Sequence, residues 1–283
     1  MNIIENKTEG DDYNFSVKEI IKQAWKNTYG VKLTMWTSMI IYTILSILIL
    51  LVGYVAISYF ETGIITTEII NYSPETETFK SQLEWIRWLI LFPMHTGILL
   101  LAVKKSENQI VKIKQVFKPY KFYLPILIVG ISLFLFISLS KFILQLSYEH
   151  IPNFIIIFTI LDIFITLFCT IWLTFAGLLI IEKNKTVFKA ILLSLSKLKQ
   201  HFLKVTLTLA FFVMPYFIIS NIIIFAPSFI ILGENPISSI LLITWCILIT
   251  LIILSAIWVI PTFLNLGGIL FKIIFKEKTQ NHR

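Results

Sequence analysis

Three polar residues stand inside long apolar runs, and they are the chain's candidates for chemistry within a membrane. Asp162 lies in FTILDIFITLF, His95 in FPMHTG and Asn221 in MPYFIISN. A charged side chain at the centre of a span costs about 2.5–3.5 kcal/mol on insertion scales, so it indicates function by default. The functional hypothesis is a proton or cation site at Asp162, with His95 lining the same polar cavity. The alternative is a packed bundle in which each side chain bonds to a neighbouring helix.

A second set of candidates consists of lysines that recur at helical spacing beside aromatic residues. IKQAWKNTY (21–29) and IKQVFKPYK (113–121) share the order of their residues, and 185–202 carries a similar pattern. In all three segments the lysines fall on a different helical face from the apolar residues. A basic amphipathic helix beside a span is typical of an interfacial helix that contacts anionic lipid. The candidate lipid-contacting residues are Lys18, Lys22, Trp25, Lys26, Lys114, Phe117, Lys118, Lys121, Lys185, Lys189 and Lys197.

No pattern in the chain favours an enzyme or a bound metal. Cys169 and Cys246 both lie inside apolar runs and form no CxxC or Cys/His spacing. Nucleotide-binding loops, HExxH and GxSxG are absent from the sequence. The loops between apolar runs are also too short for a soluble catalytic domain. We therefore expect no catalytic residue, no metal ligand and no cofactor.

The composition sets the class of protein that must position these residues. The chain has 283 residues, of which 57% are hydrophobic and 14% charged, and its mean hydropathy is +0.85. A soluble domain carries about 25% charged residues, so this chain cannot cover a water-facing surface. A spanning helix needs about 20 apolar residues. Six runs meet that need, at 33–60, 85–103, 122–146, 153–181, 205–232 and 238–271. We predict an all-α membrane bundle of six spans.

The distribution of charge predicts the orientation of the bundle. Of the 24 basic residues, 21 fall in 1–32, 104–121, 182–204 and 272–283, which alternate with segments that are poor in lysine. The first of those other segments, 61–84, carries five glutamates against one lysine. The positive-inside rule then places both termini in the cytoplasm. The net charge of +8 thus reflects topology, and we expect no nucleic-acid partner.

The basic segments and the spans together predict a threefold plan. A polar tail (1–14) precedes a membrane domain (15–271), and a basic tail (272–283) follows it. Within the domain, a unit of basic amphipathic helix, outward span and returning span starts near 15, 108 and 185. The first two units share residues, whereas the third shares the layout alone. Pro119 is predicted to end the second basic helix, because proline breaks the helical hydrogen-bond ladder.

Two of the spans are interrupted by residues that disfavour a regular helix. Pro215 and Asn221 interrupt the fifth span, and IPTFLNLGG (260–268) interrupts the sixth. Broken helices build the midplane sites of transporters. Proline and glycine are also frequent in ordinary membrane helices. The interruptions do not match between units, so we favour a role in packing.

Three stretches resemble a broad bacterial group of six-span membrane proteins. They are IIKQAWKNTYGVKLTMW (20–36), FPMHTGILLLAV (92–103) and LLIIEKNKTVFKAILLSLSKLKQHF (178–202). The group includes membrane domains fused to some glycerophosphodiester phosphodiesterases, and stand-alone proteins of unknown function. The hydrolase domain of the fused members has no counterpart in this sequence. The resemblance implies an architecture in the bacterial cytoplasmic membrane and no reaction.

The functional expectation is a non-enzymatic membrane protein. Its basic cytosolic collar faces anionic lipid, in a structural or envelope-homeostasis role. The alternative is a small-solute or ion transporter that uses Asp162 and His95 inside the bundle. A lipid-processing enzyme or nuclease is least supported, because no constellation of residues favours one. Membrane lipids are the expected partners, and the sequence names no protein partner.

Overall fold

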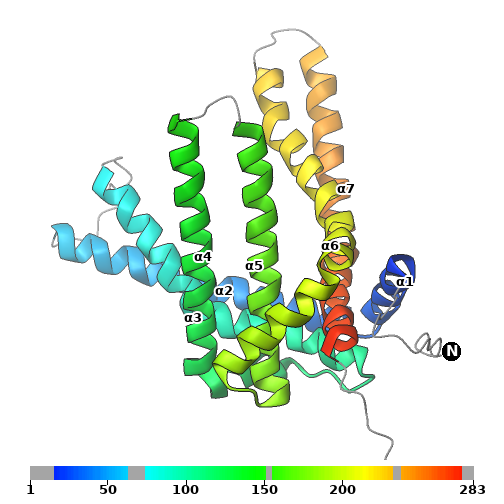
Figure 1. The fold of residues 1–283 in the computed structure, drawn as a ribbon. Coiled ribbons are helices and arrows are strands. Elements are labelled where there is room, and N and C mark those ends of the chain that lie inside the picture. The colour runs from blue at the N-terminus through cyan, green and yellow to red at the C-terminus, as the bar shows by residue number, and fades with distance from the viewer. Residues whose placement is uncertain (1–15, 63–73, 151–154, 232–236, 276–283) are drawn as a thin grey trace, which may run out of the picture.

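The computed structural model describes residues 16–62, 74–150, 155–231 and 237–275, and helices are the only regular elements in these ranges. Figure 1 shows the arrangement of the helices along the chain. In chain order they are α1 (Val17–Thr28), α2 (Lys32–Thr62), α3 (Pro74–Ser106), the 3₁₀ helix η2 (Ile113–Phe122), α4 (Tyr123–His150), α5 (Ile155–Lys183), α6 (Val187–Ile231) and α7 (Ile237–Phe275).

Five segments of the described residues are long and apolar enough to cross a membrane. They are Lys32–Ala56, Gln82–Ser106, Ile113–Leu146, Phe164–Lys183 and Ser255–Phe275. Each overlaps one of the predicted spans. The remaining predicted span, 205–232, falls in α6, where the side chains from residue 210 lie outside the described residues. The all-helical, multi-pass character predicted for the chain is therefore confirmed.

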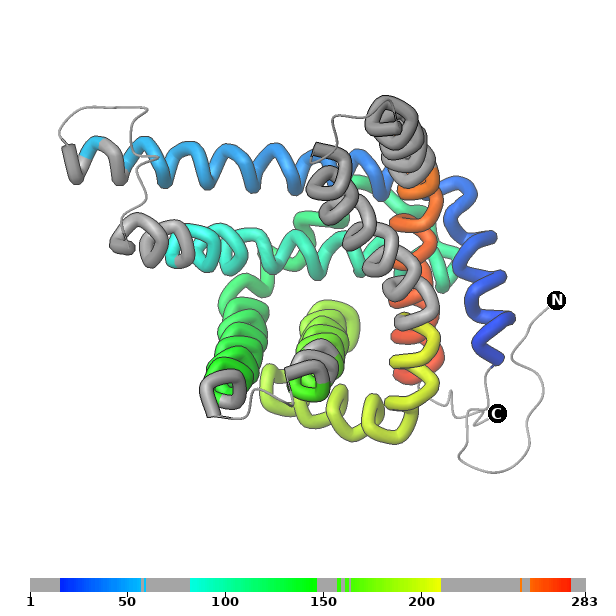
Figure 2. Tube along the Cα trace, turned by 90° about the horizontal axis from the view of Figure 1, so that it is seen from above, coloured from blue at the N-terminus to red at the C-terminus, as the bar shows by residue number. Residues whose placement is uncertain are grey.

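The hairpins are not all parallel to one another. α4 packs beside α5, and α2 packs beside α3. Figures 1 and 2 show that the α2–α3 pair runs crosswise to the α4–α5 pair. Gly130 of α4 lies at the crossing, where an added Cβ would come within 3.0 Å of the Phe92 ring. The small residue lets the two hairpins approach closely.

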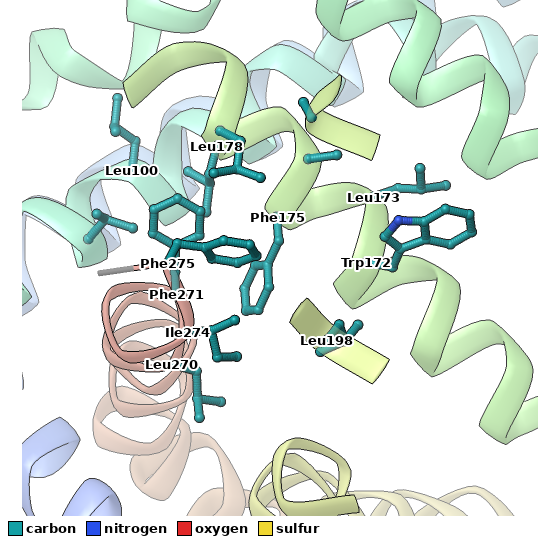
Figure 3. Close-up of a cluster of buried hydrophobic side chains, with 14 of the residues drawn as sticks. Leu100, Trp172, Leu173, Phe175, Leu178, Leu198, Leu270, Phe271, Ile274 and Phe275 are labelled. Atoms are coloured by element: carbon teal, nitrogen blue, oxygen red, sulfur yellow. The ribbon is translucent and has the colours of Figure 1, made fainter. Parts of the chain in front are cut away.

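Among the described residues, the buried core gathers where α3, α5 and α7 finish and the basic segments lie. We call this the basic end. Leu100 of α3, Phe175 of α5 and Phe271 of α7 are all buried there, and Figure 3 shows them converging. The ring centroids of Phe175 and Phe271 are 5.7 Å apart. By contrast, only 6% of the span of α2 is buried, as expected of apolar residues that lipid covers.

The three basic segments follow one packing rule. α1 packs on α7, η2 packs on α3, and the first part of α6 packs on α5. Each basic segment thus lies on the returning helix of the unit before it, and α1 closes the cycle on the last returning helix. Each predicted unit is thereby in contact with the unit before it.

The returning helices also share a short sequence pattern. TGIL (96–99), AGLL (176–179) and GGIL (267–270) each place a small residue, a glycine and two large apolar residues near the basic end. A Cβ on Gly97 would fall 2.0 Å from the carbonyl oxygen of Val116, and one on Gly268 would fall 2.4 Å from the carbonyl carbon of Ala102. A Cβ on Gly177 would meet the Thr96 methyl group at 3.2 Å. The glycines permit close helix contact, as small residues do in membrane bundles.

Two of the basic segments differ from their predicted form. The segment 185–202 is not a separate helix, because α6 continues through it to Ile231. Figures 1 and 2 show its first part crosswise to α5. The second segment is a 3₁₀ helix that runs past Pro119 to Phe122, so the prediction that Pro119 ends it is wrong. In a 3₁₀ helix proline frees the carbonyl three residues earlier, here that of Val116, which meets Gly97.

Candidate functional site

The first basic segment turns its lysines away from the protein. Ile20, Ala24 and Thr28 of α1 are buried against α7, whereas Lys18, Lys22 and Lys26 are exposed. The apolar face of α1 is therefore covered by protein instead of lipid. The lysine face remains open to the surroundings.

Trp25 of α1 is 42% exposed and stacks on Trp258 of α7, with 5.7 Å between the ring centroids. Tyr29 approaches the same ring at 5.0 Å, and the ammonium group of Lys32 lies 3.8 Å from its centroid. A lysine over an indole face makes a favourable cation–π contact. Trp25 was predicted to contact lipid, and its stacking gives it a role in docking α1 on α7 as well.

The second basic segment keeps two of its three candidate lysines open. Val116 and Pro119 are buried, and Lys114 and Lys121 are exposed. Phe117 is also 41% exposed. The third lysine, Lys118, forms an ion pair of 3.1 Å with Glu182 at the end of α5. Its ammonium group is engaged by protein, so Lys118 is a weaker lipid candidate than its neighbours.

Glu182 is the centre of a small ionic cluster that joins three elements. Its carboxylate contacts Lys118 of η2 at 3.1 Å and Lys104 of α3 at 4.0 Å. The Lys104 ammonium also donates to the Gln109 side-chain oxygen at 3.0 Å. Nearby, Lys272 donates a bond of 2.6 Å to the carbonyl of Ser106, the last residue of α3. Such a cation at a helix C-terminus is favourable.

The third basic segment repeats the arrangement of the first. Ala190, Ser194 and Leu198 are buried, Lys189 is exposed, and Lys185 and Lys197 are half-buried. Two bonds lock this face to α5. The Trp172 indole donates to the Ile191 carbonyl at 2.9 Å, and the Ser194 hydroxyl donates to the Trp172 carbonyl at 2.8 Å.

The candidate lysines of the collar therefore divide by environment. The outward lysines, as we call the exposed members, carry charge that faces away from the packed core. They are Lys18, Lys22, Lys26, Lys114, Lys121 and Lys189. Lys32, Lys104, Lys118 and Lys272 instead contact named protein groups. The sequence pattern alone did not separate the two kinds.

The structure does not bring Asp162 and His95 together. Asp162 accepts a hydrogen bond from the Ser140 hydroxyl of α4, and the half-buried His95 stacks on Phe92 at 6.4 Å between centroids. α5 passes α3 at Gly177, which contacts Thr96, the residue after His95. Asp162 lies fifteen residues from Gly177, or about 22 Å along the helix. The two polar side chains thus occupy different levels.

The interruption in α7 has a packing role in the structure. Pro261 has no N–H, so in a helix it leaves the carbonyl of Ile257 without its usual partner. The Trp36 indole of α2 donates to that carbonyl at 3.0 Å. Asn265 is fully buried and donates to the Thr28 hydroxyl at 3.2 Å. Thr28 also lies 3.1 Å from the Thr262 hydroxyl.

Two hydrogen-bonding residues at the junction of α1, α2 and α7 were not predicted from the sequence. Trp36 and Thr28 carried no recognisable motif, although Pro261 implies a free carbonyl four residues earlier. Asn221 lies in α6 where side chains are outside the described residues. No group of three or more His, Cys, Asp or Glu residues that could hold a metal occurs in the part of the chain that the structure describes.

The site and fold define an all-helical protein with apolar helices suited to a membrane and a lysine-rich end. The sequence matches no protein-family profile, no curated protein and no solved structure.

Proposed function

We propose that the protein is a non-enzymatic component of the bacterial cytoplasmic membrane. In this role its basic end faces the cytoplasm and binds anionic lipid, which supports envelope structure or homeostasis. Both termini lie on that side. The observation that carries the proposal is the division of the lysines, because the outward lysines come from three separate segments, each of which packs by its other face on α7, α3 or α5.

The packing of the basic segments supports this role. Their apolar faces rest on α7, α3 and α5, so the lysine faces are held at fixed positions. A juxtamembrane lysine contributes about 1 kcal/mol of attraction to an anionic surface. Several lysines on one rigid collar add their contributions without each segment having to fold on the membrane.

The test compares two kinds of lysine in otherwise equal backgrounds. The variant Lys114→Gln with Lys121→Gln removes two outward charges from η2, and binding of the purified protein to anionic lipid in nanodiscs is measured by native mass spectrometry. We expect roughly tenfold weaker binding or more, from about 1 kcal/mol for each lysine. The matched pair of single variants is Lys114→Gln and Lys118→Gln. Because Lys118 pairs with Glu182, Lys118→Gln should weaken binding less than Lys114→Gln does. Equal lipid binding by the double variant and the parent contradicts the proposal.

The transporter alternative required Asp162 and His95 to share a polar cavity. Their different levels along α5 and α3, together with the Ser140 bond, favour the packed arrangement. We therefore put the collar forward as the functional surface. Solute uptake into proteoliposomes that is abolished by Asp162→Asn would reverse this preference.

A further inference from the structure

One hairpin presents an apolar surface that contains two opposite charges. The α4–α5 arm, as we call residues 135–146 of α4 and 157–165 of α5, rises beyond the crossing with α3 in Figure 1. Its exposed apolar side chains are Leu135, Phe136, Leu139, Phe142, Ile143 and Leu146 of α4 and Ile157, Leu161, Phe164 and Ile165 of α5. The charges on the arm are Lys141 and Asp162.

The two charges lie at the same level of the arm. The Ser140 hydroxyl donates to Asp162, which fixes the carboxylate beside that residue, and Lys141 is the next residue along α4. Successive residues of a helix project about 100° apart. Lys141 therefore projects from the side of α4, whereas Ser140 points toward α5. Lys141 is exposed and Asp162 half-buried.

Neither charge has an ion-pair partner within the described residues. A carboxylate can accept about four hydrogen bonds, and the structure gives Asp162 the single Ser140 hydroxyl. Charged residues inside spans normally face a bundle interior and pair with one another. Here they occur on an arm whose exposed side chains, apart from Lys141 itself and Gln145, are apolar among the described residues. A partner that carries both charges at the same level would satisfy each of them.

We propose that this partner is a second copy of the chain, docked arm to arm about a twofold axis along the membrane normal. In a twofold interface residue i of one copy meets residue j of the other, and j meets i. Two Lys141–Asp162 ion pairs then form across the axis, at one depth in the membrane. Lipid tails are as apolar as leucine, so the apolar side chains alone would not select this contact. The ion pairs supply the selectivity.

Charge reversal offers a test that depends on contact between copies. Donor- and acceptor-labelled proteins are reconstituted in proteoliposomes, and energy transfer is measured over a range of protein-to-lipid ratios. We expect transfer for the wild-type protein and at least tenfold weaker association for Lys141→Asp alone and for Asp162→Lys alone. Each single variant places like charges at both contacts.

The decisive measurement uses a mixture of the two single variants. In a mixed pair one contact keeps the original Lys141 and Asp162, and the other joins the two reversed charges, so energy transfer should return. An ion pair within one chain would not be restored by mixing. The neutral variants Lys141→Gln and Asp162→Asn, which should also weaken association, serve if a reversed variant does not fold.

Three results overturn the proposal. The first would be a wild-type protein that stays monomeric at every protein-to-lipid ratio, as expected where lipid alone covers the arm. The second would be single variants that associate as strongly as the wild type, which would place any interface elsewhere. The third would be a mixture of the two variants that shows no more energy transfer than either variant alone.

Discussion

The indole nitrogen of Trp36 donates a hydrogen bond of 3.0 Å to the carbonyl oxygen of Ile257, the group that Pro261 leaves without a helical partner. This bond joins α2 to α7 at the point where α7 is interrupted. It converts a local defect of one span into a contact between two. The interruption is therefore part of the packing, and its removal has consequences that can be measured.

Replacing Trp36 with Phe should destabilise the protein. The phenyl ring fills part of the space but cannot donate, so the Ile257 carbonyl is left without this partner. A buried polar group without its hydrogen bond costs about 1–3 kcal/mol, which should lower the midpoint of thermal unfolding in detergent. Trp88→Phe is the control, because no hydrogen bond of the Trp88 indole is found in the described part of the chain.

The same bond predicts a rescue. Pro261→Ala restores an N–H that can bond to the Ile257 carbonyl, so Trp36→Phe should cost less in that background than in the parent. The two substitutions are then non-additive, as expected of residues that share one partner. Strict additivity of the two effects would show that the Trp36 side chain stabilises the fold by its ring contacts alone.

Adjacent glycines in α7 provide a matched pair of substitutions. A Cβ on Gly268 would fall 2.4 Å from backbone carbon of Ala102, whereas the nearest atom to one on Gly267 is a Leu99 methyl carbon at 3.5 Å. Gly268→Ala should cost about 1–3 kcal/mol or more, since α3 and α7 must separate. Gly267→Ala should be neutral or stabilise by up to about 1 kcal/mol through helix propensity. Equal unfolding temperatures for the two variants would contradict the contact.

Hydropathy and charge predicted the class of fold well. Lipid contact selects long apolar runs, so the five segments that are apolar enough to cross a membrane were visible in the sequence. The packing of those segments was not visible. An amphipathic pattern shows that a face is apolar, and it cannot say whether protein or lipid covers it. Ile20 and Ala24 are covered by α7.

The sequence also did not predict which protein groups surround each polar residue. Lys114 and Lys118 occupy the same kind of position in the sequence, yet Lys118 meets Glu182, sixty-four residues away, and Lys114 is exposed. Asp162 and His95 were grouped because both are polar and lie inside apolar runs. Only the crossing of the hairpins shows that they lie at different levels.

Removing the charge of Glu182 should strengthen lipid binding. Glu182→Gln releases Lys118 from its carboxylate partner, so the Lys118 ammonium group can turn to anionic lipid, whereas Lys104 keeps its bond to Gln109. We expect binding to nanodiscs to rise severalfold, from about 1 kcal/mol per lysine, with a loss of stability near or below about 1 kcal/mol. Glu107→Gln changes the net charge equally at an exposed position. If Glu107→Gln has the same effect as Glu182→Gln, release of Lys118 is not the cause.

The junction of α1 and α7 predicts a second non-additive pair, at Thr28 and Asn265. Asn265 donates to the Thr28 hydroxyl at 3.2 Å and to the Pro261 carbonyl at 2.9 Å, while its Oδ1 atom has no partner among the described residues. Thr28→Val leaves this amide proton only the weakly accepting Met35 sulfur, 3.7 Å from the Asn265 nitrogen, and should cost about 1–2 kcal/mol, whereas Thr28→Ser keeps the hydroxyl and should cost less. Asn265→Leu removes the unpaired Oδ1 atom together with the amide donor, so we expect little change in stability. In the Asn265→Leu background Thr28→Val should lose most of its cost, because no buried amide then depends on the hydroxyl.

Thermal unfolding of the two single variants and the double variant measures this coupling between Thr28 and Asn265. A full cost of Thr28→Val in both backgrounds would rule the coupling out.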